Sequence, residues 1–381
     1  MDSKGHFRRL KDWDYSKGAS LFITVALEDR RPLFGHVEGG IMVLSPLGEE
    51  VLASLEAIPR IHPEITLYGH VVMPDHVHFN CHLAAGLKEP LRVLGKAIAG
   101  FKAVTTRLPQ AQCACGSTTA SGPTPRELQP EPPQRTPGMR SGCAAEAEQP
   151  QRSPGMRSEE AEQPQRSPGM RSGGARPPGA RIWRAGYHDH LCLSRRFIDS
   201  TERYIAYNPL KWELMHGAGG LRILEPLSSP RLDPEEYWKG VGNPALLSAE
   251  GKLVSLRVSR KVRDIAAVVA RMEEAADQGF TVISGFVSKG EQAVRDALCR
   301  KPGARLIHLR ASCIPNARFK PESAYVQAFA EDRCLKLGRG NEEIAFDRAA
   351  CLDVNEEIVR IATAGPGLAL YFTENGLVRL G

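Results

Sequence analysis

The segment from residue 107 to residue 180 limits how the rest of this chain can fold. It is rich in Pro, Gly, Ser, Gln and Arg and has almost no apolar periodicity. One nine-residue motif recurs in near-copies at 133–141, 150–158 and 164–172. Repeats this short and polar cannot bury a core, so we predict a disordered insert. Closing a long loop costs little more than closing a short one, so the flanking segments can still form one domain.

The composition sets broad limits on the class of protein. A chain of 381 residues can bury enough surface for two domains. Lys+Arg 50 against Asp+Glu 44 gives a formal net charge of +6, which suits a nucleic-acid partner without requiring one. The polar start predicts no signal peptide, and no apolar run is long enough to span a bilayer. The nine cysteines are scattered and odd in number, which argues against a disulfide framework, so we expect a reducing cytoplasm.

A strand, a tight turn and a second strand are predicted over residues 67–83. The turn is Pro74-Asp75, and after it four polar residues alternate with apolar ones: His76, His78, Asn80 and His82. A strand has period 2, so these polar side chains share one face. Two imidazoles at i and i+2 can aim at one point, as a metal site requires. The alternative is the polar, solvent-facing side of an edge strand.

A second informative stretch follows the insert. Asp199 or Ser200 can cap a helix there, and Pro209 disfavours helix at the preceding residue, so the helix is expected to end near Asn208. Tyr204 lies four residues before Asn208, on the same face of the last turn. A phenol and an amide carbonyl would then project together. The alternative is that the tyrosine only packs and the asparagine only caps the helix.

Taken together, the Met-Pro-Asp-His-Val-His run at 73–78 and the Tyr-Ile-Ala-Tyr-Asn-Pro run at 204–209 resemble the single-tyrosine HUH transposases. They are most similar to the REP-associated tyrosine transposases, which join a Met-Pro-x-His-hydrophobic-His hairpin to a Tyr-Ile-x-x-Asn-Pro helix end. The combination in this order is specific, whereas each piece alone is not. The likeness covers residues 7–105 and 181–220, including 20–25 and 182–190.

The resemblance implies a metal site and a nucleophile. His76 and His78 would hold Mg²⁺ or Mn²⁺, with Asn208 as the third ligand through its carbonyl oxygen. Two imidazoles and an amide leave positions open for a phosphate oxygen and water, whereas zinc favours a closed tetrahedral site. Tyr204 would attack the phosphate and form a 5′-phosphotyrosine, leaving a free 3′-hydroxyl. Tyr207 is the rival nucleophile.

The implied activity is that of a metal-dependent endonuclease and strand transferase acting on single-stranded DNA that flanks a hairpin, in DNA transposition or REP-type repeat processing. Arg8, Arg9, Lys96 and Lys102 are the candidate DNA contacts; a solvated surface is the alternative for each. Asp75 either tunes a histidine or only forms the turn. We expect a monomer or homodimer in the cytoplasm, associated with the nucleoid. The alternative is a domesticated DNA-binding protein without catalysis.

Without the insert, the order of predicted elements suits an α+β ferredoxin-like sandwich whose antiparallel sheet carries the histidines. A helix with an interruption at Pro46 is predicted over 38–58, and a second helix over 87–106. The predicted organisation is 1–106 for the first part of the HUH domain, 107–180 for the insert, 181–225 for the nucleophile helix, 226–234 for a linker, and 235–381 for an α/β Rossmann-like domain.

The last third of the chain alternates between strand and helix patterns. Strands are predicted over 252–258, 280–285 and 305–309, and helices over 262–278 and 292–298. This alternation favours a parallel sheet of Rossmann type, although the Gly-x-Gly-x-x-Gly fingerprint is absent.

This part resembles, over shorter segments, the Rossmann-like domain of DNA-processing protein A. The matching pieces are 242–244, 259–260, 284–286 with Glu291, and 348–361 with Asn355. Ligands in such sheets bind beyond the carboxyl ends of the strands. The candidate phosphate contacts are therefore Ser259, Arg260, Ser284, Gly285 and Ser288, with tight turns as the alternative. A further possibility is a nucleotide-handling enzyme that carries the first domain as a passenger.

Overall fold

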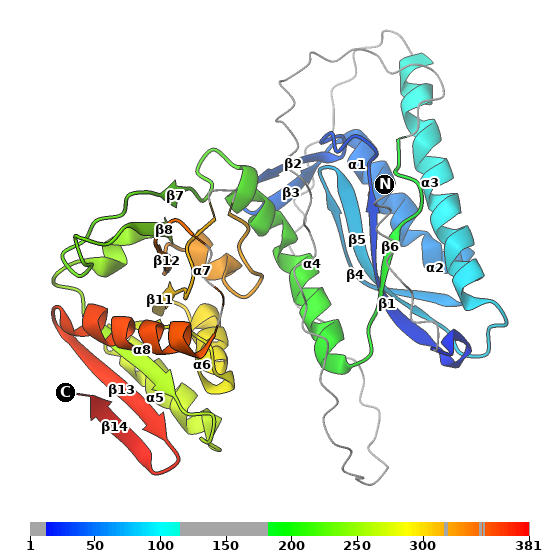
Figure 1. Cartoon of the computed structure of the whole chain (residues 1–381). Coiled ribbons are helices and arrows are strands. Elements are labelled where there is room, and N and C mark those ends of the chain that lie inside the picture. The colour runs from blue at the N-terminus through cyan, green and yellow to red at the C-terminus, as the bar shows by residue number, and fades with distance from the viewer. Residues whose placement is uncertain (1–12, 115–181, 316–318, 343–344, 346, 381) are drawn as a thin grey trace.

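The structure is a computed structural model that describes residues 13–114, 182–315, 319–342, 345 and 347–380. It is a mixed α/β protein built around two main sheets (Figure 1). Arg8, Arg9 and most of the predicted insert lie outside the described residues. Within the described residues, no helix is both long and apolar enough to cross a membrane.

The first sheet has four antiparallel strands in the order β4-β5-β1-β6. Apolar side chains on one face form a core with helices α1 and α3, and helix α4 covers the other face. The predicted histidine hairpin is confirmed, and residues 20–25 lie in strand β1. The bounds are β1 Ala19–Ala26, β4 Ile65–Met73, β5 His76–Leu83, β6 His188–Leu191, α1 Pro46–Glu56, α3 Pro90–Ala114 and α4 Arg195–His216.

The helix predicted over 38–58 is wrong in its first part. A hairpin of β2 (Gly35–Glu38) and β3 (Ile41–Leu44) occupies that stretch, and α1 begins at Pro46. Proline suits the first helical position because its missing N–H needs no partner there. Ser45 caps the helix, since its Oγ accepts a hydrogen bond from the N–H of Gly48 at 3.1 Å. Pro46 therefore starts a helix rather than interrupting one. A short helix, α2 (Ile58–Ile61), follows α1.

Helix α3 extends to Ala114, eight residues beyond its predicted end at 106 and into the segment assigned to the insert. The chain that returns after the insert is fastened to this helix. The indole N–H of Trp183 donates to Thr105 Oγ1 at 2.8 Å, and Trp183 also bridges Leu27 next to β1. Both flanks of the insert thus meet within the first core, as the loop-closure estimate requires.

Helix α4 begins earlier than predicted. Ser194 is its cap, with Oγ accepting from the N–H of Phe197 at 3.2 Å. The two predicted caps lie inside the helix instead, where Asp199 forms an ion pair with Arg195 at 2.9 Å. Ser200 is exposed on the same helix.

The predicted end of this helix near Asn208 is also wrong, because α4 continues through Pro209 to His216. An interior proline removes one backbone hydrogen bond, so the continuation needs support from packing. That support comes from the β2–β3 hairpin: Leu210 packs against Gly40, and a Glu213 oxygen accepts from the N–H of Gly39 at 3.0 Å. Tertiary contacts outweigh the local preference here.

The second sheet has eight strands in the order β14-β13-β9-β10-β11-β12-β8-β7. The five strands from β13 to β12 are parallel, and the outer three pair antiparallel with their neighbours. The bounds are β7 Ile223–Leu224, β8 Trp238–Gly242, β9 Leu253–Val258, β10 Thr281–Ser284, β11 Arg305–Leu309, β12 Cys334–Arg339, β13 Gly367–Thr373 and β14 Gly376–Leu380.

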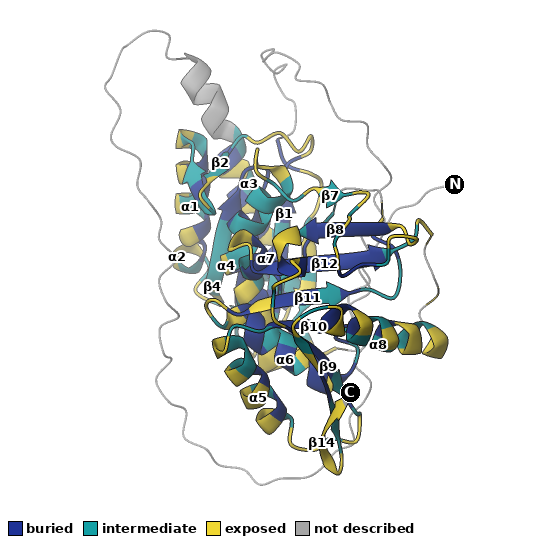
Figure 2. Ribbon diagram, turned by 90° about the vertical axis from the view of Figure 1, so that its left-hand side faces the viewer, coloured by how far each residue is buried: buried dark blue, intermediate teal, exposed yellow. Residues whose placement is uncertain are grey.

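Helices cover both faces of this sheet. Helices α5 (Ile265–Asp277) and α6 (Lys289–Arg300) pack on one face, and α8 (Arg348–Thr363) packs on the other. Figure 2 shows the central strands buried and the outer sides of α5 and α8 exposed. The predicted strands and helices between 252 and 309 are confirmed, with ends shifted by a few residues. Three short helices complete the described chain: η1 Tyr15–Lys17, η2 Pro244–Leu247 and α7 Val326–Ala330.

Candidate active site

Strand β5 places the two predicted imidazoles on one face, with ring centroids 4.5 Å apart. Both side chains are buried under α4. The Nδ1 of His76 lies 2.5 Å from Asp75 Oδ1, and the Nδ1 of His78 lies 2.9 Å from Thr24 Oγ1. A ring nitrogen held in this way fixes the orientation of the imidazole and leaves Nε2 as its remaining position for a ligand.

Asp75 does more than form the turn. Burial alone would raise the pKa of its carboxyl, but the hydrogen bond with His76 and the charges of His76 and Arg30 outweigh burial and lower that pKa. The guanidinium of Arg30 lies 3.4 Å from the second carboxylate oxygen. An ionised Asp75 accepts the Nδ1–H of His76, so the lone pair of that ring lies on Nε2. Of the two roles considered for Asp75, this supports that of tuning a histidine.

His78 is neutral at physiological pH. Burial lowers the pKa of its imidazole well below the ordinary value of 6.5, and nearby positive charge from His76 and Arg30 lowers it further. Only a neutral imidazole can bind a metal ion or accept a proton. The local environment therefore keeps this side chain in the protonation state that either role would require.

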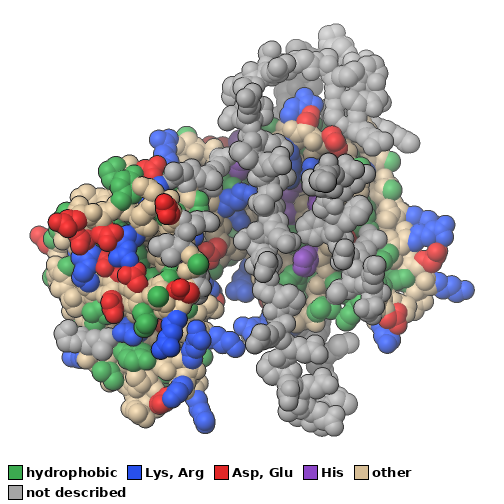
Figure 3. Space-filling model, in the orientation of Figure 1, with side chains coloured by type: hydrophobic (Ala, Val, Ile, Leu, Met, Phe, Trp, Pro, Cys, Tyr) green, Lys and Arg blue, Asp and Glu red, His purple; other side chains and the backbone are tan. Residues whose placement is uncertain are grey.

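Helix α4 brings Tyr204 to the same place. Its ring centroid is 5.3 Å from that of His78 and 5.8 Å from that of Phe22, which itself stacks on His78 at 5.1 Å. The Nζ of Lys211 lies 5.4 Å from the centre of the phenol ring. Two segments on opposite sides of the insert thus meet in one cluster. Figure 3 shows histidine side chains and Lys and Arg side chains close together on the face between the two halves of the molecule.

Asn208 is buried on the same helix, and its Nδ2 has no hydrogen-bond partner among the described residues. It lies one turn after Tyr204 and one turn before Trp212, whose ring centroid is 6.1 Å from that of His76. Residues four apart share a helix face, so the amide lies between the side chains that contact the two imidazoles. A buried amide N–H without a partner costs free energy, and only a hydrogen-bond acceptor can satisfy it.

A second unpartnered amide lies on β5 itself. Both side-chain atoms of Asn80 are buried and have no hydrogen-bond partner among the residues that the structure describes. The side chain belongs to the face that carries His76 and His78, and the sequence pattern alone indicates no role for it. Across the described ranges, no cluster of three or more His, Cys, Asp or Glu side chains could hold a metal ion.

The rival nucleophile points elsewhere. The hydroxyl of Tyr207 donates to Gln327 Oε1 on α7 at 3.2 Å. Its phenol oxygen is therefore directed toward the second half of the molecule, whereas the Tyr204 ring contacts the imidazole of His78.

The predicted DNA-contacting lysines on α3 differ in their surroundings. Lys96 is exposed. Lys102 donates to the backbone carbonyl of Arg184 at 2.8 Å and also to that of Gly186, and burial lowers the pKa of its ammonium group. These bonds hold Lys102 on the chain that returns from the insert, rather than leaving its charge in solvent.

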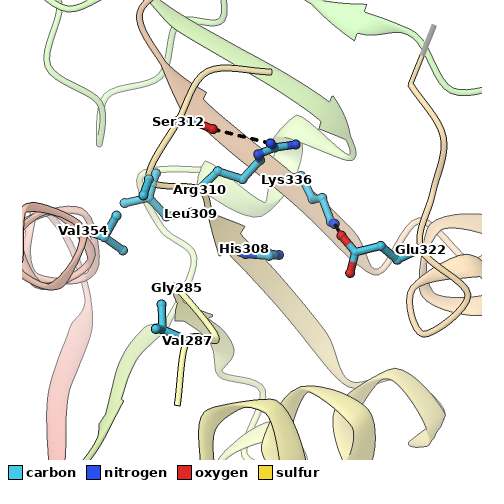
Figure 4. Close-up of a pocket in the computed structure, with 10 residues that line it drawn as sticks. Gly285, Val287, His308, Leu309, Arg310, Ser312, Glu322, Lys336 and Val354 are labelled. Carbon is cyan, nitrogen blue, oxygen red and sulfur yellow. Dashed lines mark hydrogen bonds and ion pairs between the residues drawn. The ribbon is translucent and has the colours of Figure 1, made fainter. Parts of the chain in front are cut away.

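The second sheet has a pocket of about 340 Å³ at the carboxyl ends of β10, β11 and β12 (Figure 4). The sequence did not indicate Arg310, Ser312 or Lys336, because they lie in the loop after β11 and in the unpredicted strand β12. Of the five predicted contacts, only Gly285 lines it. The lining residues are Gly285, Val287, His308, Leu309, Arg310, Ala311, Ser312, Glu322, Lys336 and Val354.

Charged groups are paired within this pocket. Lys336 Nζ lies 2.7 Å from a Glu322 oxygen, and Arg310 Nη2 lies 3.5 Å from Ser312 Oγ (Figure 4). Burial, followed by the charges of Lys336 and other cations, holds the pKa of His308 well below its ordinary value. The cavity thus combines a neutral imidazole with two cationic side chains.

The three serines predicted to contact phosphate instead form hydrogen bonds within the turns at the strand ends. Ser284 Oγ accepts from the N–H of Phe286 at 3.1 Å, and Ser259 Oγ accepts from the N–H of Lys261 at 3.3 Å. Ser288 caps α6 in a capping box with Glu291. These bonds favour the tight-turn alternative for the three serines. Arg260 is exposed and does not line the pocket.

Replacing Ser288 by alanine tests the capping role. We expect Ser288→Ala to lower the free energy of unfolding by about 1 kcal/mol, because an N-cap hydroxyl satisfies an otherwise unpaired backbone N–H. Urea denaturation of the full chain measures this difference. Ser200→Ala, an exposed change inside α4, is the control and should have almost no effect. An unchanged stability for Ser288→Ala would contradict the capping role.

Comparison with known proteins gives only distant similarity. No family model matches the chain. A protein from Haemophilus influenzae (strain ATCC 51907 / DSM 11121 / KW20 / Rd), described as an uncharacterized protein, is 24% identical over 206 residues, which are 54% of this chain and 88% of that protein.

Two solved structures are also similar to parts of the chain. A REP-associated tyrosine transposase bound to a REP hairpin matches with a TM-score of 0.27 and 15% identity, over 54% of this chain and 72% of that chain. DNA processing protein A from Helicobacter pylori, studied for single-stranded DNA binding, matches with a TM-score of 0.29 and 19% identity, over 37% of this chain and 65% of that chain. Because these TM-scores are low, the chemistry proposed for this protein rests on its own residues.

Proposed function

We propose that this protein cuts and rejoins single-stranded DNA through a covalent tyrosine intermediate, with Tyr204 as the nucleophile. The observation that carries the proposal is the meeting of Tyr204 with His76 and His78, from segments separated by the insert. The four-stranded sheet, with its order β4-β5-β1-β6 and helices on both faces, supports a ferredoxin-like domain. The five parallel strands of the second sheet support a Rossmann-like domain.

The site also suits a divalent cation, for which His76, His78 and Asn208 would be the protein ligands. The Nδ1 atom of each ring is already engaged, His78 is held neutral, and Asn208 is buried on α4 one turn after Tyr204. When bound, Mg²⁺ or Mn²⁺ would polarise the scissile phosphate and stabilise the charge that develops on it. Asp75 and Thr24 would orient the two imidazoles.

The proposed transfer conserves the number of phosphate ester bonds. The Tyr204 oxygen forms a bond to phosphorus as the bond from phosphorus to the 3′-oxygen breaks. The phenol proton passes to that oxygen, which leaves a 3′-hydroxyl and a 5′-phosphotyrosine. The Lys211 ammonium, 5.4 Å from the ring centre, favours the negative charge that builds up on the phenol. The reverse attack by a 3′-hydroxyl rejoins the strand without a nucleotide cofactor.

The test uses a randomised single-stranded DNA library with a fixed hairpin, incubated with the full chain and Mn²⁺. We expect a protein–DNA adduct that resists denaturation. The adduct should retain a label placed at the 3′ end of the DNA, while the released fragment should be extended by a polymerase from its free 3′-hydroxyl. An adduct that retains the 5′ label would show the opposite polarity, and the absence of any adduct would refute the proposed function.

A second candidate function is nucleotide binding by the second half, which the pocket near Lys336 favours. Arg310 and Lys336 offer cations for a phosphate at the carboxyl ends of parallel strands, where ligands bind in such sheets. A binding protein without catalysis would need this pocket but not the tyrosine.

This candidate predicts that AMP raises the melting temperature of the full chain and that adenosine does not. Saturation at about one hundred times the dissociation constant stabilises by about 2.7 kcal/mol, which gives a shift of several degrees. Arg310→Met should abolish the shift. Arg300→Gln, an exposed cation on α6, should keep it. Equal effects of AMP and adenosine would contradict phosphate recognition.

A further inference from the structure

A second pocket, of about 600 Å³, adjoins the candidate active site. One wall comes from the segment before β2 and from β2 itself, with Leu33 and Val37 in the lining. The other wall is the last turns of α4, with Trp212, Glu213 and His216. Its volume lies within the range of about 300–1,000 Å³ that small organic ligands occupy in proteins.

Two contacts connect this pocket to the candidate active site. Pro74, in the lining, directly precedes Asp75, whose carboxylate holds His76. The ring centroid of Trp212 is 6.1 Å from that of His76. A group held in the pocket would therefore lie beside the imidazole of His76 and about two to three turns of α4 away from Tyr204.

The wall formed by α4 is aromatic and held in place. The rings of Trp212 and His216 are stacked, with centroids 4.1 Å apart and planes inclined by 22°. His216 Nδ1 lies 3.0 Å from the carbonyl oxygen of Trp212, which fixes the second ring. Aromatic surfaces of this kind bind unpaired bases, because every base has a flat face for stacking.

Glu213 adds a polar group to the same wall. One carboxylate oxygen accepts from the N–H of Gly39 and ties the two walls together at 3.0 Å. Its second oxygen has no hydrogen-bond partner among the described residues. An ionised carboxylate only accepts hydrogen bonds, so it favours a base with an exocyclic amine, such as cytosine or adenine, over thymine.

We infer that this pocket takes one unstacked base of the DNA strand, next to the phosphate that Tyr204 attacks. The inference rests on the proposed function and deepens it, because a base fixed in the pocket determines which phosphate lies against the phenol. Trp212 and His216 supply the stacking surface, and Glu213 supplies the preference for an amine-bearing base.

The experiment uses an oligonucleotide that the unaltered chain cleaves, with 2-aminopurine substituted at one position at a time around the cleavage point. Binding is measured with the Tyr204→Phe chain, so that the DNA stays intact. We expect fluorescence quenching at one position adjacent to the cleavage point. Trp212→Ala in this background should remove the quenching and raise Kd about tenfold, because stacking on one aromatic side chain contributes about 1–3 kcal/mol.

The controls separate stacking from folding. Trp212→Phe keeps an aromatic face and should retain most of the quenching. Tyr237→Ala removes an exposed aromatic side chain outside the pocket and should change neither quenching nor Kd. Glu213→Gln should weaken the preference for cytosine or adenine over thymine at the quenched position.

Three outcomes would overturn the inference. The first is an absence of 2-aminopurine quenching at every position. This measurement uses the Tyr204→Phe chain with an intact pocket, so it tests the inference even if Trp212→Ala does not fold. The second is a folded Trp212→Ala chain with unchanged quenching. With either of these two outcomes, adduct formation by the unaltered chain would still support the proposed function. If the unaltered chain forms no adduct with any library member, both the proposed function and the inference fail.

Discussion

Tyr204→Phe is expected to remove the covalent protein–DNA adduct and to leave the affinity for single-stranded DNA almost unchanged. The substitution deletes only the hydroxyl, so the ring keeps its contacts with His78 and Phe22. Without the phenol oxygen no bond to phosphorus can form, and the loss is complete rather than partial. Gel analysis of adduct formation, together with a binding titration of the same labelled oligonucleotide, measures both quantities.

Tyr207→Phe is the matched control for this prediction. It removes a hydroxyl from the same helix, but one that donates to Gln327. We expect adduct formation to persist and the stability to fall by about 1 kcal/mol, since one hydrogen bond is lost. Mass spectrometry of the digested adduct should place the nucleotide on Tyr204. If Tyr207→Phe abolishes the adduct and Tyr204→Phe does not, the nucleophile has been assigned to the wrong residue.

We expect His78→Ala, or chelation of divalent cations with EDTA, to lower the rate of adduct formation by about a hundredfold or more. A cation at the phosphate contributes several kcal/mol of transition-state stabilisation, and each 1.36 kcal/mol is a factor of ten in rate. Single-turnover kinetics measure the rate, and calorimetric titration with Mn²⁺ measures cation binding directly. Added Mn²⁺ should restore the chelated wild-type chain but not His78→Ala.

His82→Ala is the control for His78→Ala. His82 belongs to the same face of β5, but its Nδ1 lies 3.0 Å from Ser20 Oγ, away from the imidazole pair. The His82→Ala chain should retain both cation binding and the rate of adduct formation.

Thr24→Val keeps the shape of the side chain but loses the hydroxyl that contacts His78 Nδ1. A loss of about tenfold is expected for this change in orientation. A full rate in EDTA would show that the reaction needs no metal.

Within the candidate active site, the sequence predicts correctly those residues whose placement follows from the periodicity of a single strand or helix. Alternation along β5 predicted that His76 and His78 share a face, and helical spacing predicted that Tyr204 and Asn208 do. Lys211 and Trp212 were missed because Pro209 was expected to end the helix, and only the packing of α4 against the β2–β3 hairpin shows otherwise.

Other parts of the site depend on long-range register or on unpredicted elements. Thr24 meets His78 because β1 pairs with β5 in one register, which no local pattern specifies. In the second half, Arg310 and Lys336 line the pocket from a loop and from a strand that were not predicted. The spacing from Ser288 to Glu291 is itself a capping-box signature, and it could have indicated a structural role for the serine.

Helix α4 belongs to both halves of the molecule. Tyr204 faces the first sheet, whereas Tyr207 bonds to α7 and Leu214 packs in a core of the second half. Strand β7, which lies before the predicted linker, pairs with β8 of the second sheet. A fragment ending at residue 225 would therefore lack the residues of the second half that pack against α4, the helix that carries Tyr204. If the isolated first half formed no adduct with DNA, the loss of packing on α4 would be a sufficient cause. That result would not test whether Tyr204 is the nucleophile.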